Sequence, residues 1–389
     1  MAMKIDFGLA VLVLSDAVDL VGVDAVQHSK RVAALAMASG FAMGWDREAL
    51  HDLFLASLMH DCAVSTTGEY NRLMTEFAAK DADSHCMRGF EILRRFSPFE
   101  RAAGIVRYHH ESWGEHPVAD SAPLTALMSN AVFLADRVDM FVQLGPAGSF
   151  IRERAGLLDM LERMEGDYFA PALLEAFKSV SEKDALWLTL EAHHLERHLL
   201  RVLERLGEHT ITFDQFHDLA DIFATIVDSK SPYTSGHSQG VARLSRFLGE
   251  CAGLSPEDCE YLEISGLLHD LGRLRVPDEI MEKEGPLDRI ELAEVKRGAF
   301  ETYQILSRLP GMNGLARWAS YHYEPVLPPR EGAPQTTIQP AIVAEADTYQ
   351  SLTQPRPYRG SLDPDALVET VQKMGVHGKL HPEVVELVV

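Results

Sequence analysis

The chain contains an internal repeat, because the same short segments occur in the same order in each half. The segment VQHSKRVAALA around His28 returns as SGHSQGVARLS around His237, and LASLMHDCA around His60 returns as ISGLLHDLG around His269. Both pairs are separated by 209 residues. Two later segments return at a separation of 213 residues, as a four-residue insertion in the second copy would give: Gly89–Leu93 at Thr302–Leu306, and Tyr108–Glu111 at Tyr321–Glu324. The 389 residues are therefore expected to form two domains of one fold, each with its own core.

Both copies show the apolar periodicity of α-helices. The segment before the first His-Asp pair places Leu50, Leu53, Phe54 and Leu58 on one helical face, and its counterpart in the second half repeats the pattern. Strand patterns of period two are nearly missing from the sequence, and Pro and Gly cluster between the expected helices. We expect an all-α protein with two helical bundle domains, residues 1–145 and 208–389, joined by a long helical connector at residues 146–207.

Potential metal ligands follow one another along the first half. A His-Asp pair can chelate one ion where a helix ends, since neighbouring residues inside a helix point about 100° apart. Helices of a bundle could each deliver one or two ligands to a shared interior. The candidate metal ligands are His28, His60, Asp61, His85, His109, His110 and Asp136. Five imidazoles and two carboxylates suit iron, manganese, zinc or nickel better than calcium or copper.

These motifs resemble the HD superfamily of metal-dependent phosphohydrolases, and within it the HD-GYP cyclic-di-GMP phosphodiesterases. The family order is a helix His, an HD pair, a His four residues before a Gly, an HHE triplet, and an Asp followed three residues later by a second acid, here Asp139. The resemblance implies one metal on His28, His60, Asp61 and Asp136, and another on His85, His109 and His110. Asp61 would bridge the two ions, and Asp61 and His60 are the catalytic candidates. It also implies that a metal-bridging hydroxide attacks phosphorus, with iron or manganese favoured over zinc or nickel.

Both halves depart from the family pattern. In the first half Val64 stands where the family has a lysine that contacts phosphate, so Arg88, Arg31 and His116 are candidate substitutes. In the second half Gly298 stands in the place of His85, and Tyr323 replaces one histidine of the HHE triplet, leaving His322. The remaining possible metal ligands there are His237, His269, Asp270 and Asp347, and the possible phosphate contacts are Arg273, Arg356 and Arg359.

Two interpretations of the second half stay open. It is either a domain that binds one metal or senses a nucleotide, or a degenerate copy that supports the first domain or forms a homodimer. For the whole protein, the leading hypothesis is a phosphodiesterase acting on a cyclic dinucleotide similar to cyclic-di-GMP, or on a related phosphoester. The alternatives are a non-catalytic signalling adaptor or nucleotide receptor, and a phosphohydrolase acting on nucleotides or other phosphomonoesters.

Charge and cysteine usage limit the partners and the compartment. The formal net charge of −22 disfavours DNA, RNA and anionic membranes as partners, so a phosphate substrate needs local positive charge from metals or arginines. The early apolar run near residues 7–14 is too short to span a bilayer, and we expect no membrane insertion. Four scattered cysteines, none in a CxxC pair, suit a reducing cytoplasm.

Overall fold

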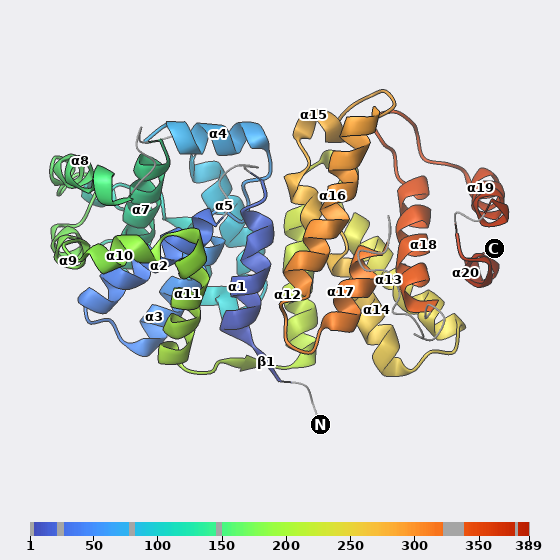
Figure 1. Ribbon diagram of the computed structural model, residues 1–389, viewed down its shortest axis with the longest axis horizontal. Coiled ribbons are helices and arrows are strands. Elements are labelled where there is room, and N and C mark those ends of the chain that lie inside the picture. Colours follow the sequence, from blue (N-terminus) through green and yellow to red (C-terminus); the bar gives the residue numbers. More distant parts are fainter. Residues whose placement is uncertain are drawn as a thin grey trace. The chain divides into compact units, whose positions relative to one another are not determined.

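The computed structural model describes residues 4–21, 27–77, 82–144, 150–321, 338–377 and 380–388. It confirms the all-α prediction: within these ranges the regular structure is helical apart from one short pair of strands. The chain divides into two compact units (Figure 1). Unit 1 comprises Met1–Val64 and Gly68–Phe213, and unit 2 comprises Ser65–Thr67 and Asp214–Val389.

Unit 1 is arranged around one central helix, α2. Its leading elements are β1 (Ile5–Asp6), α1 (Phe7–Val18), α2 (His28–Ala42), α3 (Arg47–Met59), α4 (Thr67–Thr75), α5 (Ala82–Leu93), η1 (Ser97–Phe99), α6 (Glu100–Arg107), η2 (Trp113–Glu115) and α7 (Pro123–Leu144). Helix α2 packs against α3 and α7, and even its Lys30 and Arg31 are buried. Buried charged groups need partners of opposite charge, so the residues that surround Lys30 and Arg31 are candidates for a polar site inside unit 1.

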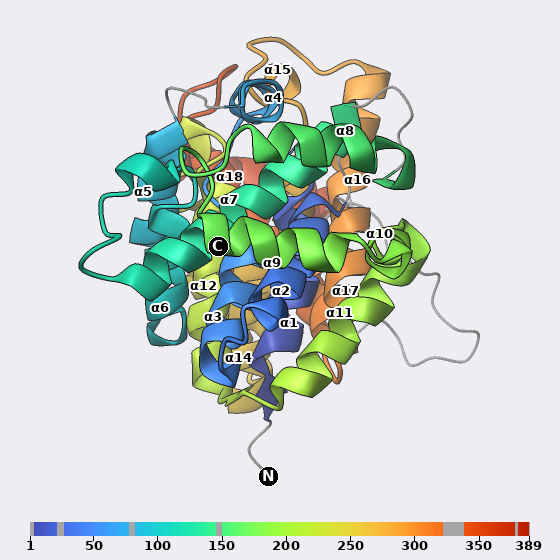
Figure 2. The same cartoon turned by 90° about the vertical axis from the view of Figure 1, so that its left-hand side faces the viewer.

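Residues 146–207 differ from the connector expected from the sequence. They form α8 (Phe150–Glu162), α9 (Pro171–Ser181), α10 (Asp184–Thr189) and α11 (Ala192–Leu206), and these helices belong to unit 1. Helices α9 and α11 pack against α2 (Figure 2). These helices pack onto unit 1 because α11 buries an apolar stripe against it. The stripe consists of Leu195, Leu199, Val202 and Leu206. After α11, β2 (Thr210–Ile211) pairs antiparallel with β1.

Unit 2 repeats the helix order of unit 1. It contains α12 (Phe213–Asp228), η3 (Pro232–Thr234), α13 (His237–Cys251), α14 (Pro256–Leu268), η4 (Leu271–Arg275), α15 (Asp278–Met281), α16 (Arg289–Leu306), α17 (Asn313–Ser320), α18 (Ile338–Thr353), α19 (Pro364–Val376) and α20 (Pro382–Val388). Helix α13 packs against α14 and α18, as α2 packs against α3 and α7. The internal repeat is thus a structural repeat, with α13, α14, α16 and α18 as the second copies of α2, α3, α5 and α7. His322 and Tyr323 lie outside the described residues.

Candidate metal centre

Both His-Asp pairs stand directly at the end of a helix, as the sequence analysis predicted. Helix α3 begins at an N-cap, Asp46, whose side chain accepts a hydrogen bond from the Ala49 N–H, and it ends at Met59 with His60 at the C-cap. Helix α14 ends at Leu268 with His269 at the C-cap. Because the helix stops at the histidine, the aspartate that follows can turn toward the same interior.

The first histidine of each copy opens a helix after a residue with left-handed backbone. In unit 2 that residue is Gly236, with φ of 68°, before His237. In unit 1 it is Gln27, with φ of 73°, before His28. Glycine adopts this conformation freely, whereas a side chain at this position costs about 1–2 kcal/mol. The turn directs the first imidazole into the bundle in both copies, so the fold holds this backbone even where no glycine is present.

Asp61 lies at the centre of the candidate ligands of unit 1, and its two oxygens face different histidines. Its Oδ2 atom is 3.4 Å from His60 Nε2 and 4.0 Å from His28 Nε2. Its Oδ1 atom is 3.4 Å from His85 Nε2 and 3.6 Å from His109 Nε2. A carboxylate placed between two groups of imidazoles has the geometry required of a ligand that bridges two ions.

The ligand atoms also have the spacing that a metal ion requires. Two atoms that share one transition-metal ion at about 2.1 Å lie roughly 3.0–3.5 Å apart. Around the first group, His28 Nε2 is 3.5 Å from Asp136 Oδ1, and His28, His60 and Asp136 offer atoms within 4.8 Å of one another. Asp136 comes from the middle of α7, so α2, α3 and α7 together build this group. The residues therefore fit a divalent metal.

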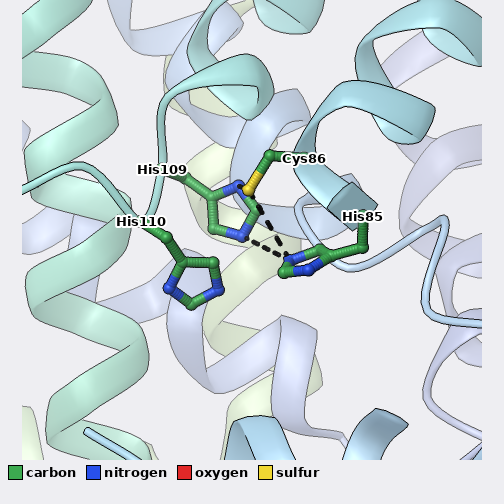
Figure 3. A group of neighbouring side chains, drawn as sticks. All are labelled: His85, Cys86, His109 and His110. Atoms are coloured by element: carbon green, nitrogen blue, oxygen red, sulfur yellow. Dashed lines mark hydrogen bonds between the residues drawn. The ribbon is translucent and has the colours of Figure 1, made fainter. Parts of the chain in front are cut away.

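The second group is formed by α5 and the turn after α6 (Figure 3). His85 Nε2 lies 3.3 Å from His109 Nε2, and the His110 ring faces both, with its centroid 5.0 Å from that of His85 and 4.3 Å from that of His109. Cys86 completes the group, with Sγ 3.5 Å from His109 Nδ1 and 3.7 Å from His85 Nε2. The sequence analysis did not include Cys86 among the ligands, although its position directly after His85 was a usable signal.

Buried polar atoms without partners support the fit. Among the described residues, His28 Nε2, His60 Nε2 and Asp61 Oδ1 are enclosed yet form no hydrogen bond. Leaving such atoms unsatisfied costs roughly 1–3 kcal/mol each, and native proteins avoid it. His28 Nε2 and His60 Nε2 belong to the first group, whereas Asp61 Oδ1 faces His85 and His109 of the second, so metal bound at these groups would satisfy all three atoms.

The opposite nitrogens of His60 and His109 are held by hydrogen bonds that fix each ring. His60 Nδ1 lies 2.9 Å from the Ser57 carbonyl, and His109 Nδ1 lies 2.7 Å from the Val106 carbonyl. A ring whose Nδ1–H donates to a carbonyl presents a bare Nε2 to a metal. Burial lowers the pKa of His109 to about 4, so this imidazole is neutral and ready to coordinate.

Asp139 orients His28 and is itself held by an arginine. His28 Nδ1 is 2.8 Å from Asp139 Oδ2, and Arg31 donates to both Asp139 oxygens, at 2.5 and 2.9 Å. Burial opposes ionisation of both partners, but their attraction prevails: the pKa of His28 is raised to about 9 and the pKa of Asp139 is lowered to about 2. A carboxylate behind an imidazole makes that imidazole a stronger metal ligand.

Arg137 holds the carboxylate of Asp136 in place, as Arg31 holds that of Asp139. The Arg137 guanidinium is buried and donates to Asp136 Oδ2 at 2.6 Å and to the carbonyls of Glu76 and Phe77 at 3.0 and 3.1 Å. It leaves Asp136 Oδ1 directed toward His28. Sequence reasoning missed Arg137, since nothing in the residue order distinguishes it from a surface arginine of the same helix.

The four candidate phosphate contacts have different surroundings. Arg88 forms an ion pair with Glu69 at 2.6 Å and donates to Ser84. Arg359 donates to a set of backbone carbonyls, those of Ser351, Leu352, Gln354 and Gly360. Arg273 and Arg356 lie beside the candidate ligands of unit 2, and phosphate contact by any of the four arginines stays a prediction. Arg273 donates to Asp270 Oδ2.

The candidate ligands of unit 2 also converge. His237 Nε2 lies 3.1 Å from Asp347 Oδ1, and His269 Nε2 lies 3.7 Å from the same oxygen. Asp270 Oδ2 is 3.4 Å from His269 Nε2. The four residues predicted from the sequence are thus brought together, from α13, from the end of α14 and from α18.

Comparisons with known proteins agree with this geometry. The HD domain family matches residues 25–140 and, in a second form, residues 221–384. The chain belongs to the HD-domain family of metal-dependent phosphohydrolases, with two such domains in tandem. It is 30% identical over 386 residues to the 3'3'-cGAMP-specific phosphodiesterase 1 of Vibrio cholerae serotype O1, covering 97% of this chain and 89% of that protein.

Further relatives extend the comparison. The cyclic di-GMP phosphodiesterase of Thermotoga maritima is 28% identical over 201 residues, which are 48% of this chain and 53% of that protein. In structure, the chain is similar to a cyclic GMP-AMP-specific phosphodiesterase of V. cholerae (V-cGAP3), with a TM-score of 0.70 and 24% identity. That match covers 99% of this chain and 97% of the other, and it supports the tandem helical fold. Of the described helices, none combines the length and apolarity needed to cross a membrane.

Proposed function

We propose that unit 1 is a phosphodiesterase centre that hydrolyses a cyclic dinucleotide with two divalent ions bridged by Asp61. The observation that carries this proposal is the division of the Asp61 carboxylate between two histidine groups. Oδ2 faces His60 and His28, and Oδ1 faces His85 and His109. Two oxygens that face different histidine pairs suit two ions, each held by one oxygen.

The ligands divide between the two proposed ions. His28, His60 and Asp136 would hold one, and His85, His109 and His110 would hold the other, with Asp61 shared and with Cys86 as an added donor to the second ion. When bound, such a pair lowers the pKa of water and stabilises charge on a phosphoryl group. The ions also supply positive charge to a chain whose formal net charge is −22. The imidazole and carboxylate donors suit iron, manganese, zinc or nickel, and the family resemblance favours iron or manganese among them.

The relatives guide the choice of substrate. The relative matched over 97% of this chain is named a 3'3'-cGAMP-specific phosphodiesterase. The T. maritima relative, matched over 48% of this chain, is named a cyclic di-GMP phosphodiesterase. We therefore expect a cyclic dinucleotide, with 3'3'-cGAMP as the first to test. The metals would hold the phosphate oxygens, and the protein would select the bases elsewhere in the site.

The test is single-turnover hydrolysis by the full chain loaded with Mn(II) or Fe(II), with 3'3'-cGAMP and cyclic di-GMP as substrates. We expect a linear dinucleotide product from wild type, loss of product in His85→Ala and His110→Ala, and unchanged hydrolysis in the control His193→Ala, which alters an exposed histidine of α11. Metal analysis should find fewer ions in the two ligand variants. Hydrolysis that survives His85→Ala, or loaded wild type that cleaves neither dinucleotide, would overturn the proposal. Cleavage of phosphomonoesters alone would instead favour a nucleotide phosphohydrolase.

A further inference from the structure

The loop after the second metal group contains a buried imidazole whose nitrogens have no partner. His116 follows η2, on the loop that begins after His109 and His110, and it is 7% exposed. Among the residues that the structure describes, neither Nδ1 nor Nε2 of His116 has a hydrogen-bond partner. Enclosed polar atoms without partners are rare in native proteins. The imidazole is therefore placed to serve a group that the folded chain does not supply.

Two aromatic side chains flank this imidazole, and the three residues Tyr108, Trp113 and His116 are called the aromatic cluster. The ring centroids of Tyr108 and Trp113 lie 5.8 and 6.3 Å from that of His116. Tyr108 and Trp113 are half-buried, so each keeps part of its surface exposed. Sites for small molecules are lined mainly by aromatic and apolar side chains, with a few placed polar groups. The aromatic cluster has this composition.

The loop that carries the aromatic cluster is fixed to the turn between α8 and α9. The N–H groups of Trp113 and Gly114 donate to the carbonyls of Tyr168 and Asp167, at 3.2 and 2.8 Å. The two segments lie close together, because a Cβ atom on Gly114 would be 3.4 Å from the Asp167 carbonyl oxygen. This turn lies beyond residues 25–140, which the HD domain family matches. The cluster is thus held in place by a part of unit 1 outside that match.

The same turn also supports the second metal group. Phe169 packs against Phe133 with ring centroids 5.5 Å apart, and Phe133 packs against the His110 ring at 5.6 Å. Trp113 follows His110 by three residues, so their Cα atoms are at most about 11 Å apart. A nucleotide whose phosphate lay at the proposed ions could therefore place a base at the aromatic cluster.

The second copy of the repeat shows that the fold does not require such a cluster. The segment that follows its YHYE motif, residues 325–337, contains no Trp, Tyr, Phe or His. Residues needed only for packing of the common fold would be expected in both copies. The difference favours a role in ligand binding for the cluster of unit 1.

The chemistry of the cluster matches that of a nucleobase. Unpaired bases stack on Trp, Tyr and His rings, and they form hydrogen bonds along their edges. Burial lowers the pKa of His116, so its ring is neutral near pH 7. One ring nitrogen then donates a hydrogen bond and the other accepts one. His116 can therefore contact either a carbonyl or an N–H group of a base.

We propose that the aromatic cluster is a nucleobase site of unit 1, where a purine base of the cyclic dinucleotide stacks on Trp113 and forms a hydrogen bond with His116. The inference rests on the proposed function, because it assigns another part of the same substrate. The Trp113 ring, tilted by 51° from the His116 ring, would turn to lie parallel to the base. His116 would then contact the base and not the phosphate.

Steady-state hydrolysis by the full chain loaded with Mn(II) tests the assignment with two diesters. One is 3'3'-cGAMP, and the other is methyl 4-nitrophenyl phosphate, which carries no nucleobase. In Trp113→Ala and in His116→Ala we expect the KM for 3'3'-cGAMP to rise about tenfold or more, since base stacking and base contacts contribute that much to binding. The loss in kcat/KM should be at least about tenfold larger for 3'3'-cGAMP than for the small diester.

Conservative and control variants separate base contact from a structural role. Trp113→Phe should recover part of the loss because it keeps a ring, and His116→Gln should do so because it keeps a donor and an acceptor. The matched control is Trp45→Ala, which alters another half-buried tryptophan of unit 1, after the end of α2 that is roughly 20 Å from His28. It should leave the KM for 3'3'-cGAMP unchanged. Equal losses for the two diesters in Trp113→Ala would overturn the inference.

Tryptophan fluorescence tests the base contact without hydrolysis. Guanosine and adenosine, which carry no phosphate, are titrated into the full chain. We expect saturable quenching by at least one of them, retained in Trp45→Phe and absent in Trp113→Phe. Quenching that survives Trp113→Phe, or no quenching of wild type, would overturn the inference. If quenching follows this pattern but neither dinucleotide is hydrolysed, the proposed function fails and the base contact stands.

Discussion

Replacing Asp139 with asparagine tests how unit 1 prepares its first metal ligand. The change keeps the shape of the side chain but removes the charge that faces Arg31 at 2.5 and 2.9 Å and His28 Nδ1 at 2.8 Å. Breaking a fully buried ion pair costs about 3–5 kcal/mol. We expect a loss of about 3 kcal/mol in the free energy of unfolding of the metal-free protein, since the amide oxygen still accepts one hydrogen bond. Mn(II) affinity should fall about 10- to 100-fold, because a carboxylate no longer supports the imidazole.

Urea unfolding and Mn(II) titration of the full chain measure the two effects separately. The control is Asp52→Asn, which alters a buried carboxylate paired with Arg101 at 2.7 Å. Asp52 lies eight residues before His60, or roughly 12 Å along α3, so its replacement should leave Mn(II) affinity unchanged. If Asp139→Asn binds Mn(II) as tightly as wild type does, Asp139 does not position His28, and the reasoning fails.

Three further predictions concern other parts of unit 1. Cobalt-loaded protein should show a thiolate-to-cobalt absorption band that Cys86→Ser removes and Cys62→Ser keeps; a band retained in Cys86→Ser would show that this sulfur is no ligand. Gln27→Gly should raise the free energy of unfolding by about 0.5–1 kcal/mol, measured in urea, because it relieves the left-handed backbone at φ 73°. Burial lowers the pKa of His51 to about 4 from its ordinary 6.5, so the folded state resists protonation. The free energy of unfolding should therefore fall as the pH drops from 6.5 toward 4, by up to about 3 kcal/mol more in wild type than in His51→Asn. Unfolding curves of the two proteins over this pH range measure the difference, and equal pH dependence would refute the prediction.

The fold and the candidate ligands were accessible from the sequence for a simple reason. Most candidate ligands lie on a helix or directly at its end, and the internal repeat shows the same residue type at the equivalent position of the second copy. His60 and His269, for example, both follow a complete apolar helix and precede an aspartate. The repeat therefore identified the interior of each bundle before any contact was known.

The contacts that sequence reasoning missed join residues far apart in the chain. Arg31 and Asp139 are 108 positions apart, and Arg137 reaches carbonyls about 60 positions away. No periodicity links such residues. Arg88 is another example: its phosphate contact stays a prediction, and its ion pair with Glu69, on a neighbouring helix, could not be read from the sequence. The sequence predicted that residues 146–207 are helical but not that they pack into unit 1, because the partner of their apolar stripe, α2, lies more than a hundred residues earlier.

Where the two copies differ, residues that contact each other in unit 1 are replaced together in unit 2. Arg31 and Asp139 of unit 1 correspond to Gly240 and Gln350 of unit 2. A Cβ atom at Gly240 would lie 2.4 Å from Gln350 Cδ, so the glutamine occupies the space that an arginine would need. His237 Nδ1 instead pairs with the neutral Gln354, at 3.0 Å.

Loss of the arginine and loss of the carboxylate are therefore coupled, since either alone would leave a buried charge without its counterion. The same logic applies to the second metal group, where the exchange of His85 for Gly298 is accompanied by close backbone packing and by Arg273 at Asp270. Unit 2 thus reached a different balance of charge through compensated steps. The charged residues that differ between the copies are therefore exchanged together, as the cost of an unpaired buried charge requires.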